Sequence, residues 1–246
     1  MTDVNFIRAI EEMSITAWPS FRQILMDGWI VRFADGYTFR SNSVQPIYPG
    51  TAEVVEKIER CEEMYSSAGL PTAFKISPAA QPPELDSLLE SRGYRVHTPT
   101  SVRVLDTLPE PGGGLGVECV SIDEWLDAFA GLVGLSKEKM QRHAWIVERI
   151  PVPICTALVK HEGRAVACGL GMLQGEYIGL FDICTAPSMR RMGLATRVID
   201  GLFSWASLLG AQRAYLSVVE ESIPAITLYK RLGFRHVYSY WYRIKD

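Results

Sequence analysis

The segment 182–198, DICTAPSMRRMGLATRV, combines residue types that could hold an anion. Arg190 and Arg191 precede Gly193, and an amphipathic helical pattern begins near Ala195. The first turn of a helix exposes unpaired backbone N–H groups and the positive end of the helix dipole. A glycine there permits unusual dihedral angles and lets a ligand approach the backbone. The segment is therefore either an ordinary loop or a site for a phosphate or pyrophosphate group, and its position between a strand and a helix favours the site.

Periodicity and turn residues predict the elements that must position this segment. Ser121 precedes an apolar helical repeat and Glu124 follows three residues later, which is a capping box. Turn residues at 161–163 and 174–176 separate β-rich runs, which indicates antiparallel hairpins. In the second half of the chain we expect strands at 116–121, 153–161, 164–174, 177–185, 211–219 and 234–245, and helices at 121–134, 136–150, 195–209 and 223–233.

The first half repeats this order of elements. Its patterns predict helices at 3–14, 51–67 and 82–93 and strands at 28–34, 37–44, 72–77 and 94–105, with the first two strands joined at Asp35–Gly36. The shared order and spacing predict an internal duplication, in which the first copy lacks the arginine–glycine pattern. The polar run 36–46 has two interpretations. Asn42 and Ser43 satisfy backbone groups at a strand end, or the strand pairs with the second half of the chain and lines the pocket for a second substrate.

Composition and charge restrict the classes of protein that this chain can be. Its 246 residues suffice for two small domains, and the net charge of −3 argues against a nucleic-acid or membrane surface. Five widely spaced cysteines predict reduced thiols in a cytoplasmic protein, and the acidic N-terminus is unlike a signal peptide. His143, His161 and His236, three of the four histidines, show no ligand spacing, so we expect them to be solvated or structural and expect no metal site.

A run of prolines and glycines at 105–116 divides the chain. Two prolines and four glycines in this stretch cannot continue a helix or a central strand. We therefore expect an N-terminal domain at 1–108, a linker at 109–115 and a second domain at 116–246.

Two segments resemble the signature motifs of the GNAT acyltransferase superfamily. Residues 183–199 are similar to its acetyl-CoA motif, Arg/Gln-x-x-Gly-x-Gly/Ala, at Arg190, Gly193 and Ala195. Residues 214–234, AYLSVVEESIPAITLYKRLGF, are similar to its second motif at Ala225, Leu228, Tyr229, Gly233 and Phe234. The resemblance covers 116–246 in element order, and the first half resembles a degenerate copy of the same fold.

The resemblance implies a fold and a set of contacts to the cofactor. The fold is α+β (mixed α/β), with a largely antiparallel central sheet flanked by helices, parallel strands that splay at the cofactor cleft, and a tandem two-domain arrangement. The co-substrate implied is acetyl-CoA or another acyl-CoA, with no metal. Its pantetheine arm lies along strand 177–185 and its pyrophosphate on the backbone of 191–196. The implied contacts are Ile183, Cys184, Thr185, Arg190, Arg191, Met192, Gly193, Leu194, Ala195, Thr196, Ser222, Ala225 and Tyr229.

The resemblance also assigns catalytic roles, with two departures from the family pattern. Tyr229 corresponds to the acid that protonates the leaving thiolate, which suits a phenol because its usual pKa of about 10 lies above that of a thiol. Ser222 stands where the family often has Asn, and Gly179 stands near the family's strand-borne Glu. Asp182 and Glu220 remain candidates to accept a proton from the incoming amine.

The expected activity is acyl-CoA-dependent N-acylation, with acetyl-CoA as the expected donor, of a small-molecule or peptide primary amine in a ternary complex. One alternative is a module that senses acyl-CoA without turnover. Another is an aminoacyl-tRNA-dependent transferase of tandem GNAT type, against which the acidic net charge counts. We expect no nucleic-acid or membrane partner and a monomer or homodimer. The sequence names neither the amine nor the acyl-chain preference.

Overall fold

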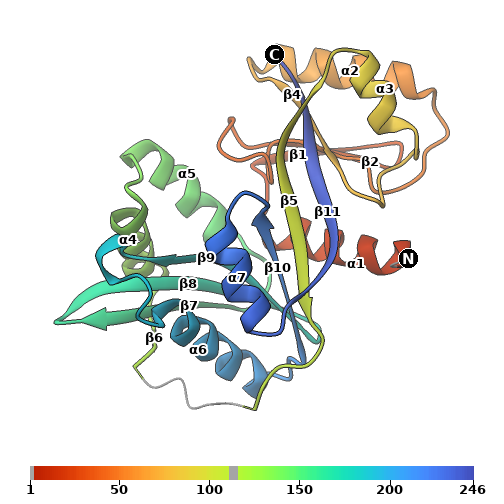
Figure 1. Cartoon of the computed structure of the whole chain (residues 1–246). Helices are drawn as coiled ribbons and strands as arrows, with labels where there is room; N and C mark the ends of the chain where they lie inside the picture. The colour runs from red at the N-terminus through yellow and green to blue at the C-terminus, as the bar shows by residue number, and fades with distance from the viewer. Residues whose placement is uncertain (1–2, 111–115) are drawn as a thin grey trace. The chain divides into compact units, whose positions relative to one another are not determined.

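The computed structural model describes residues 3–110 and 116–246. The chain forms two compact units that are not consecutive halves of the sequence (Figure 1). The N-terminal unit comprises the residues up to Val102 together with Val218–Ser222 and Val237–Asp246. The C-terminal unit comprises Arg103–Ser217 and Ile223–His236. Of the expected linker 109–115, residues 111–115 lie outside the described part of the chain.

The described residues of the N-terminal unit form three helices and a mostly antiparallel set of strands. Its strand order is β1-β2-β3-β4-β11-β5. The pairs β1–β2, β2–β3 and β4–β11 are antiparallel, whereas β3 and β4 are parallel. The final strand of the chain belongs here because Trp241–Lys245 pair with β4. The elements are α1 (Val4–Ala17), β1 (Arg22–Met26), β2 (Trp29–Phe33), β3 (Val44–Gln45), α2 (Val54–Ser67), β4 (Thr72–Ile76), α3 (Leu85–Ser91), β5 (Arg95–Leu105) and β11 (Arg235–Lys245).

Alternation along β4 separates an apolar face from a polar one. Phe74 and Ile76 join the hydrophobic core formed with α2 and α3. Lys75 points to the opposite face, where its Nζ lies 2.6 Å from a carboxylate oxygen of Glu11 on α1. Tyr238 donates a 2.6 Å hydrogen bond to the same carboxylate. Both partners of the ion pair are buried, so their mutual attraction and the hydrogen bond from Tyr238 offset part of the cost of removing the two charges from water.

The first hairpin forms at a different Asp–Gly pair from the one expected. β1 and β2 join at Asp27–Gly28, whose positive φ angles of 42° and 84° suit a two-residue hairpin turn. Backbone N–H groups of Thr51 and Ala52 donate to the Asp27 carboxylate, which fixes this turn and lowers the pKa of Asp27. The expectation of a strand at 37–44 was therefore wrong, apart from Val44.

Residues 37–43 form turns because Asn42 supplies an alternative hydrogen-bond partner to the local backbone. Its side-chain oxygen accepts from the N–H groups of Ala34 at 2.9 Å and Gly36 at 3.2 Å. Ser43 donates to the carbonyl of Phe39. Asn42 and Ser43 are both buried, so their role in satisfying backbone groups is confirmed, although they do so at a turn and not at a strand end.

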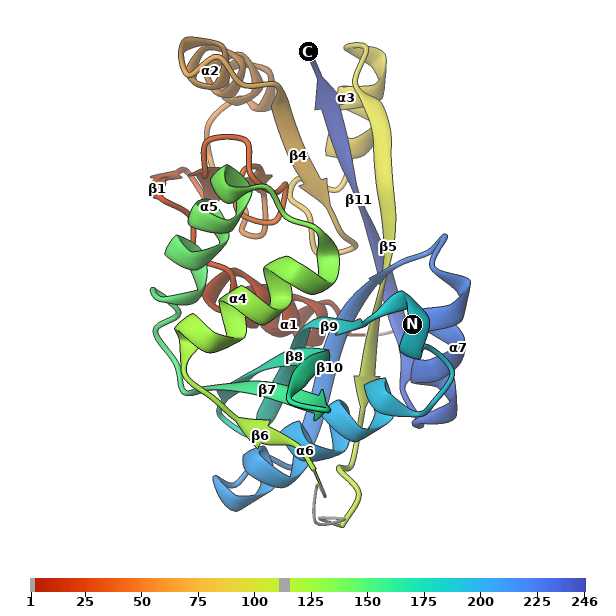
Figure 2. The same ribbon diagram turned by 90° about the vertical axis from the view of Figure 1, so that its left-hand side faces the viewer.

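The C-terminal unit is built around the strand order β10-β9-β8-β7-β6. Helices α4 and α5 lie on one face of β7–β9 and α6 on the other (Figure 2). The elements are β6 (Glu118–Cys119), α4 (Ile122–Val133), α5 (Lys137–Val147), β7 (Ile154–His161), β8 (Arg164–Gln174), β9 (Tyr177–Thr185), η1 (Pro187–Met189), α6 (Leu194–Leu208), β10 (Arg213–Val219) and α7 (Ile223–Arg231). Together the units form a mixed α/β fold with mostly antiparallel strands, as expected.

Local signals in this unit are confirmed by the contacts that they make. Ser121 accepts a hydrogen bond from the backbone N–H of Glu124, which caps α4. Gly169 and Gly171 on β8 let α6 approach closely, since a Cβ on Gly169 would lie 2.6 Å from Val198. Within the described residues, no helix is long and apolar enough to cross a membrane.

Candidate functional site

The start of α6 has the features expected of an anion site. Gly193 precedes the helix with φ at 76°, in the left-handed region that favours glycine. No side chain caps this end, and the first turn contains no acidic residue. A Cβ on Gly193 would meet nothing within 4 Å, and Arg190, Arg191 and Met192 are exposed. The backbone N–H groups of the first turn are thus open to a ligand.

The parallel strands β9 and β10 separate just before this anion site. Their pairing runs from Tyr177 with Arg213 to Leu180 with Leu216 and then stops, although β9 continues to Thr185. Cys184 and Thr185 stay paired with β8 on their other side. The expected splay of the parallel strands is confirmed. It leaves residues 181–185 of β9 unpaired on the edge that faces β10.

A β-bulge distorts β9 within this unpaired stretch. Cys168 pairs with Cys184, whereas Leu170 pairs with Phe181, so β9 carries one extra residue. Asp182 lies in the extra stretch with φ at 50°. Bulges re-aim side chains and are frequent beside active sites. Here the bulge changes the direction of the Asp182 side chain relative to a regular strand.

Asp182 faces a histidine from α5. Its Oδ2 atom lies 3.4 Å from Nε2 of His143, and the two side chains are 15% and 2% exposed. The imidazole stacks against Phe129 and Trp125 of α4, with ring centroids 4.7 and 5.9 Å away. Spacing along the sequence gave no sign of this pair, because it forms only when α5 packs against the bulged strand. Of the two expectations for His143, the solvated one is wrong, because the side chain is buried.

Gly179 has no room for the carboxylate that the family pattern places near it. Tyr215 is its partner on β10, and a Cβ on Gly179 would lie 2.8 Å from the Tyr215 hydroxyl oxygen and 2.7 Å from Phe181. Tyr215 is buried and packs edge-on against Phe181. The ring of Tyr215 thus occupies the space that a side chain at position 179 would need. Local sequence patterns could not predict this contact, because the two residues lie on different strands.

Tyr229 lies on α7 in the same compact unit as Gly193 and Asp182. It is 8% exposed, and its ring packs edge-on against Phe234 with centroids 5.8 Å apart. Ala225, one turn earlier on α7, is half-buried. The second motif therefore holds its tyrosine ring by packing, which fixes the direction of the phenol.

Glu220 and Ser222 belong to the N-terminal unit, unlike the other candidate residues. The exposed Glu220 accepts a hydrogen bond from the Ser239 hydroxyl, and its backbone N–H donates to Pro99. Ser222 is half-buried, and its backbone N–H donates to the carbonyl of Val219 at 3.0 Å. The structure thus gathers Asp182, Tyr229 and the anion motif in one unit and places these two residues in the other.

Cys184, on the strand that approaches the anion motif, has an altered acidity. A hydrogen bond from the Cys168 thiol and the positive charge of Arg190 outweigh burial and lower the pKa of Cys184 to about 7. Cys184 is half-buried, and the five cysteines are free thiols. Cys184 is therefore a partly exposed thiol on the strand that leads to the anion motif.

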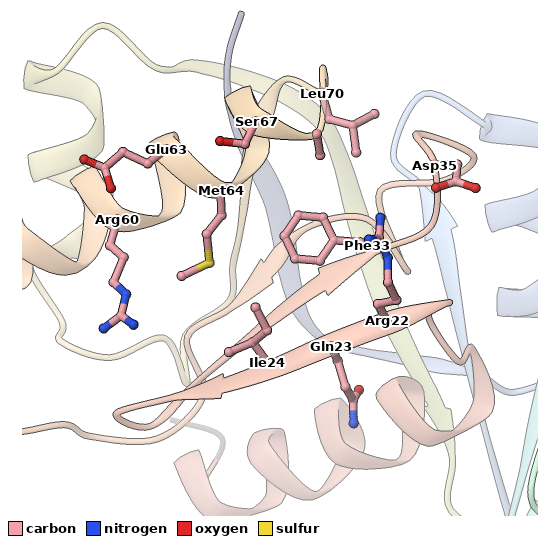
Figure 3. A pocket seen from close by; sticks show the side chains of 11 residues that line it. Arg22, Gln23, Ile24, Phe33, Asp35, Arg60, Glu63, Met64, Ser67 and Leu70 are labelled. Carbon is pink, nitrogen blue, oxygen red and sulfur yellow. The ribbon is translucent and has the colours of Figure 1, made fainter.

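A separate pocket of about 850 Å³ lies in the N-terminal unit between α2 and the β1–β2 hairpin (Figure 3). It is lined by charged residues of both signs and by apolar ones. They include Arg22, Asp35, Arg60, Glu63, Phe33 and Met64. None of the residues that line it belongs to either signature motif.

Comparisons with known proteins agree with the geometry of the C-terminal unit. A family model described as the acetyltransferase (GNAT) family matches residues 120–234. A second, described as the probable histone acetyltransferase Rv0428c C-terminal, matches residues 5–106. The tandem GNAT protein from the clavulanic acid biosynthesis pathway has a similar fold, with a TM-score of 0.60, 13% identity and coverage of 82% of this chain and 74% of that one.

Similar proteins also cover the whole chain. A GCN5-related N-acetyltransferase from Kribbella flavida shares the fold, with a TM-score of 0.73 and 19% identity over 100% of this chain and 96% of that one. The uncharacterized N-acetyltransferase YobR of Bacillus subtilis is 32% identical over 97% of this chain and 98% of its own length. Since this relative matches nearly end to end and both signature motifs lie in the matched domain, the chain belongs to the GNAT N-acetyltransferase family.

Proposed function

We propose that this protein transfers an acyl group, with acetyl-CoA as the expected donor, to a primary amine by direct attack in a ternary complex. One observation carries the proposal. The β9–β10 ladder stops at Leu180 and Leu216, and the chain then runs along an open strand edge to the uncapped helix start at Gly193. A strand edge followed by an anion site matches the order of amides and phosphates in CoA.

The donor site would use backbone groups more than side chains. The edge of Ile183–Thr185 would hydrogen-bond the pantetheine amides, and the N–H groups of 191–196 would hold the pyrophosphate. The open space at Gly193 accommodates phosphate oxygens close to the backbone. Arg190 and Arg191 would add attraction that weakens with rising ionic strength, because both side chains are exposed.

On the acceptor side, Asp182 would take a proton from the incoming ammonium group. His143 would act as a positioning residue, holding the carboxylate through the contact between Nε2 and Oδ2. Tyr215 fills the space beside Gly179, so this position of β9 could not hold a carboxylate. The acidic residue of β9 is Asp182, which lies at the bulge. Positioned proton transfer of this kind contributes roughly 10²–10⁴-fold to rate.

Tyr229 would complete the transfer. The amine nitrogen attacks the thioester carbonyl, the C–S bond breaks, and the phenol donates its proton to the departing thiolate; the nitrogen loses its second proton to solvent as the amide forms, and the phenolate regains one from solvent. The packing of Tyr229 against Phe234 fixes the phenol in advance, so the proton transfer requires little reorganisation.

Release of free CoA thiol by the full-length protein tests the proposal. Acetyl-CoA is supplied with a panel of primary amines that contains a polyamine, an aminoglycoside, amino acids, a free peptide N-terminus and a lysine peptide. The expected result is thiol release that depends on one class of amine, with an equal amount of acetylated product detected by mass spectrometry. Thiol release that is the same without any amine would contradict N-acylation.

The filled space at Gly179 supports a second candidate, a module that binds acyl-CoA without turnover. Calorimetric titration with acetyl-CoA separates the two functions. Tight binding without thiol release across the amine panel supports the sensing module, whereas amine-dependent release supports the enzyme.

A further inference from the structure

Two cysteines at the edge of the C-terminal unit lie unusually close together. The Sγ atoms of Cys119 on β6 and Cys155 on β7 are 2.7 Å apart. Non-bonded carbon atoms keep roughly 3.5–4.0 Å, and sulfur is larger than carbon. A disulfide needs about 2.0 Å between the sulfurs, so only a small further approach separates this pair from a covalent bond.

The strands around these thiols are held together on both sides of the pair. Glu118 pairs with Leu158, and its carboxylate lies 2.7 Å from Lys160 Nζ. On the other side, the Val120 N–H donates to the Thr156 carbonyl at 3.0 Å, and the Thr156 hydroxyl donates to the Val120 carbonyl at 2.6 Å. β6 is thus fixed against β7, which holds the backbones of the two cysteines at a constant separation, so the sulfurs can move apart only by rotation of their side chains.

The two thiols differ in accessibility. Cys119 is exposed, whereas Cys155 on β7 is buried, with 3% of its surface exposed. Burial, followed by the hydrogen bond with Cys119, raises the pKa of the Cys155 thiol. An oxidant from solvent meets Cys119 first because Cys119 is exposed, and Cys155, whose sulfur lies 2.7 Å away, reacts with the oxidised sulfur once its own thiol has lost its proton.

We propose that Cys119 and Cys155 form a reversible disulfide when the protein meets a peroxide. Hydrogen peroxide oxidises the Cys119 thiol to a sulfenic acid and releases water. The Cys155 sulfur then displaces the hydroxyl group of that sulfenic acid, forming the S–S bond and a second water. Overall, two thiols and one peroxide give one disulfide and two waters, and a small thiol restores the reduced pair.

The bond would close a loop that contains both α4 and α5. The two cysteines are separated by 36 positions, and His143 lies within the loop. Closing a loop reduces the conformational freedom of the opened segment, so the oxidised form resists local unfolding of these helices. Oxidation would therefore stabilise the segment that holds His143 against Asp182.

Peptide mapping of the full-length protein after peroxide treatment tests the proposal. Remaining thiols are alkylated, the protein is digested without reductant, and linked peptides are identified by mass spectrometry. The expected product joins the peptides of Cys119 and Cys155, loses two hydrogen atoms relative to the reduced pair, and is absent after dithiothreitol treatment. Cys119→Ser should abolish it, while Cys61→Ser, in the N-terminal unit, should leave it unchanged.

A second measurement keeps the test independent of any one variant. The oxidised protein should melt roughly 5–10 °C higher than the reduced protein, with slower hydrogen exchange in α4 and α5. Cys155→Ala should remove both the linked peptide and this difference. The proposal is overturned if Cys119 carries only sulfinic acid, if it remains a thiol, or if the linked peptides join Cys168 and Cys184 instead.

Discussion

His143 on α5 places its Nε2 atom 3.4 Å from Oδ2 of Asp182 at the bulge of β9. The contact joins a helix to the strand that leads to the anion motif, and both side chains are largely buried. The contact places an imidazole beside the carboxylate of Asp182, on a strand whose Gly179 position has no room for a side chain.

Asp182→Asn should lower kcat/KM roughly 10²–10⁴-fold, because an amide cannot accept the proton of the ammonium group. The measurement is the initial rate of thiol release with the best amine. Asp127→Asn, on the exposed side of α4, makes the same chemical change away from the site and should leave the rate unchanged. Equal rates for the two variants would remove Asp182 from the mechanism.

His143→Gln should lower kcat/KM less than Asp182→Asn, because it removes a contact to the carboxylate and leaves the carboxylate itself in place. Gln keeps a hydrogen-bond donor near Asp182. A purely structural role would lower the melting temperature and leave kcat/KM unchanged. Initial rates of thiol release at a temperature where both proteins are folded distinguish these roles.

Tyr229→Phe should lower kcat when chemistry limits the rate, with little change in the Kd for CoA. The substitution removes the hydroxyl group and keeps the ring that packs against Phe234. Tyr177→Phe is a matched control, since its hydroxyl accepts a 3.2 Å hydrogen bond from Arg213 at the other end of β9. An unchanged kcat for Tyr229→Phe in single-turnover experiments would show that another group protonates the thiolate.

Gly193→Glu should abolish CoA binding, while Gly193→Gln should only weaken it. Both variants strain the backbone, because φ at this position is 76°. Only the glutamate adds a negative charge where the pyrophosphate is proposed to bind. Calorimetric titration of both variants isolates the effect of charge, and identical affinities would place the pyrophosphate elsewhere.

Gly179→Ala should reduce the free energy of unfolding by roughly 1–3 kcal/mol, because its Cβ would overlap the rings of Phe181 and Tyr215. Gly131→Ala, on the exposed side of α4, should instead raise it by about 0.5–1 kcal/mol, since nothing lies near its Cβ and alanine favours a helix. Denaturant titration measures both. A neutral Gly179→Ala would mean that β9 and β10 can separate further without cost.

Stability of the N-terminal unit should fall in acid through Asp86. This carboxylate accepts hydrogen bonds from Arg243 at 2.8 and 3.0 Å and from Trp241 at 2.9 Å. The hydrogen bond from Arg243 is the main cause of the lowered pKa of Asp86. The stability that the ionised carboxylate contributes is therefore fully present above the unfolded pKa of Asp86, about 3.9, and is lost as the pH falls through its lower folded pKa.

Asp86→Asn should therefore cost roughly 1.5–3 kcal/mol at neutral pH and flatten the loss of stability below about pH 4. Glu90→Gln provides the control, because Glu90 is 69% exposed and lies 3.4 Å from the same guanidinium. Denaturant titration across pH measures both variants. An unchanged pH dependence in Asp86→Asn would assign the acid sensitivity to other carboxylates.

The sequence by itself determined most of the secondary structure and the placement of the anion motif, because caps, turns and periodicity are local signals. Ser121 and Gly193 act where the pattern placed them. Local patterns could not choose between the hairpins at Asp27–Gly28 and Asp35–Gly36, because both dipeptides favour the same turn. That choice depended on hydrogen bonds from residues 51 and 52, which are distant in sequence.

Only the tertiary structure decided which distant side chains meet. The contact of His143 with Asp182 depends on a bulge in β9, and the filling of the space beside Gly179 by Tyr215 depends on the register of two parallel strands. The approach of Cys119 to Cys155 depends in the same way on the pairing of β6 with β7. Strand register and bulges arise from packing between elements that are distant in sequence. The residue types at these positions therefore do not predict which side chains will be in contact in the folded chain.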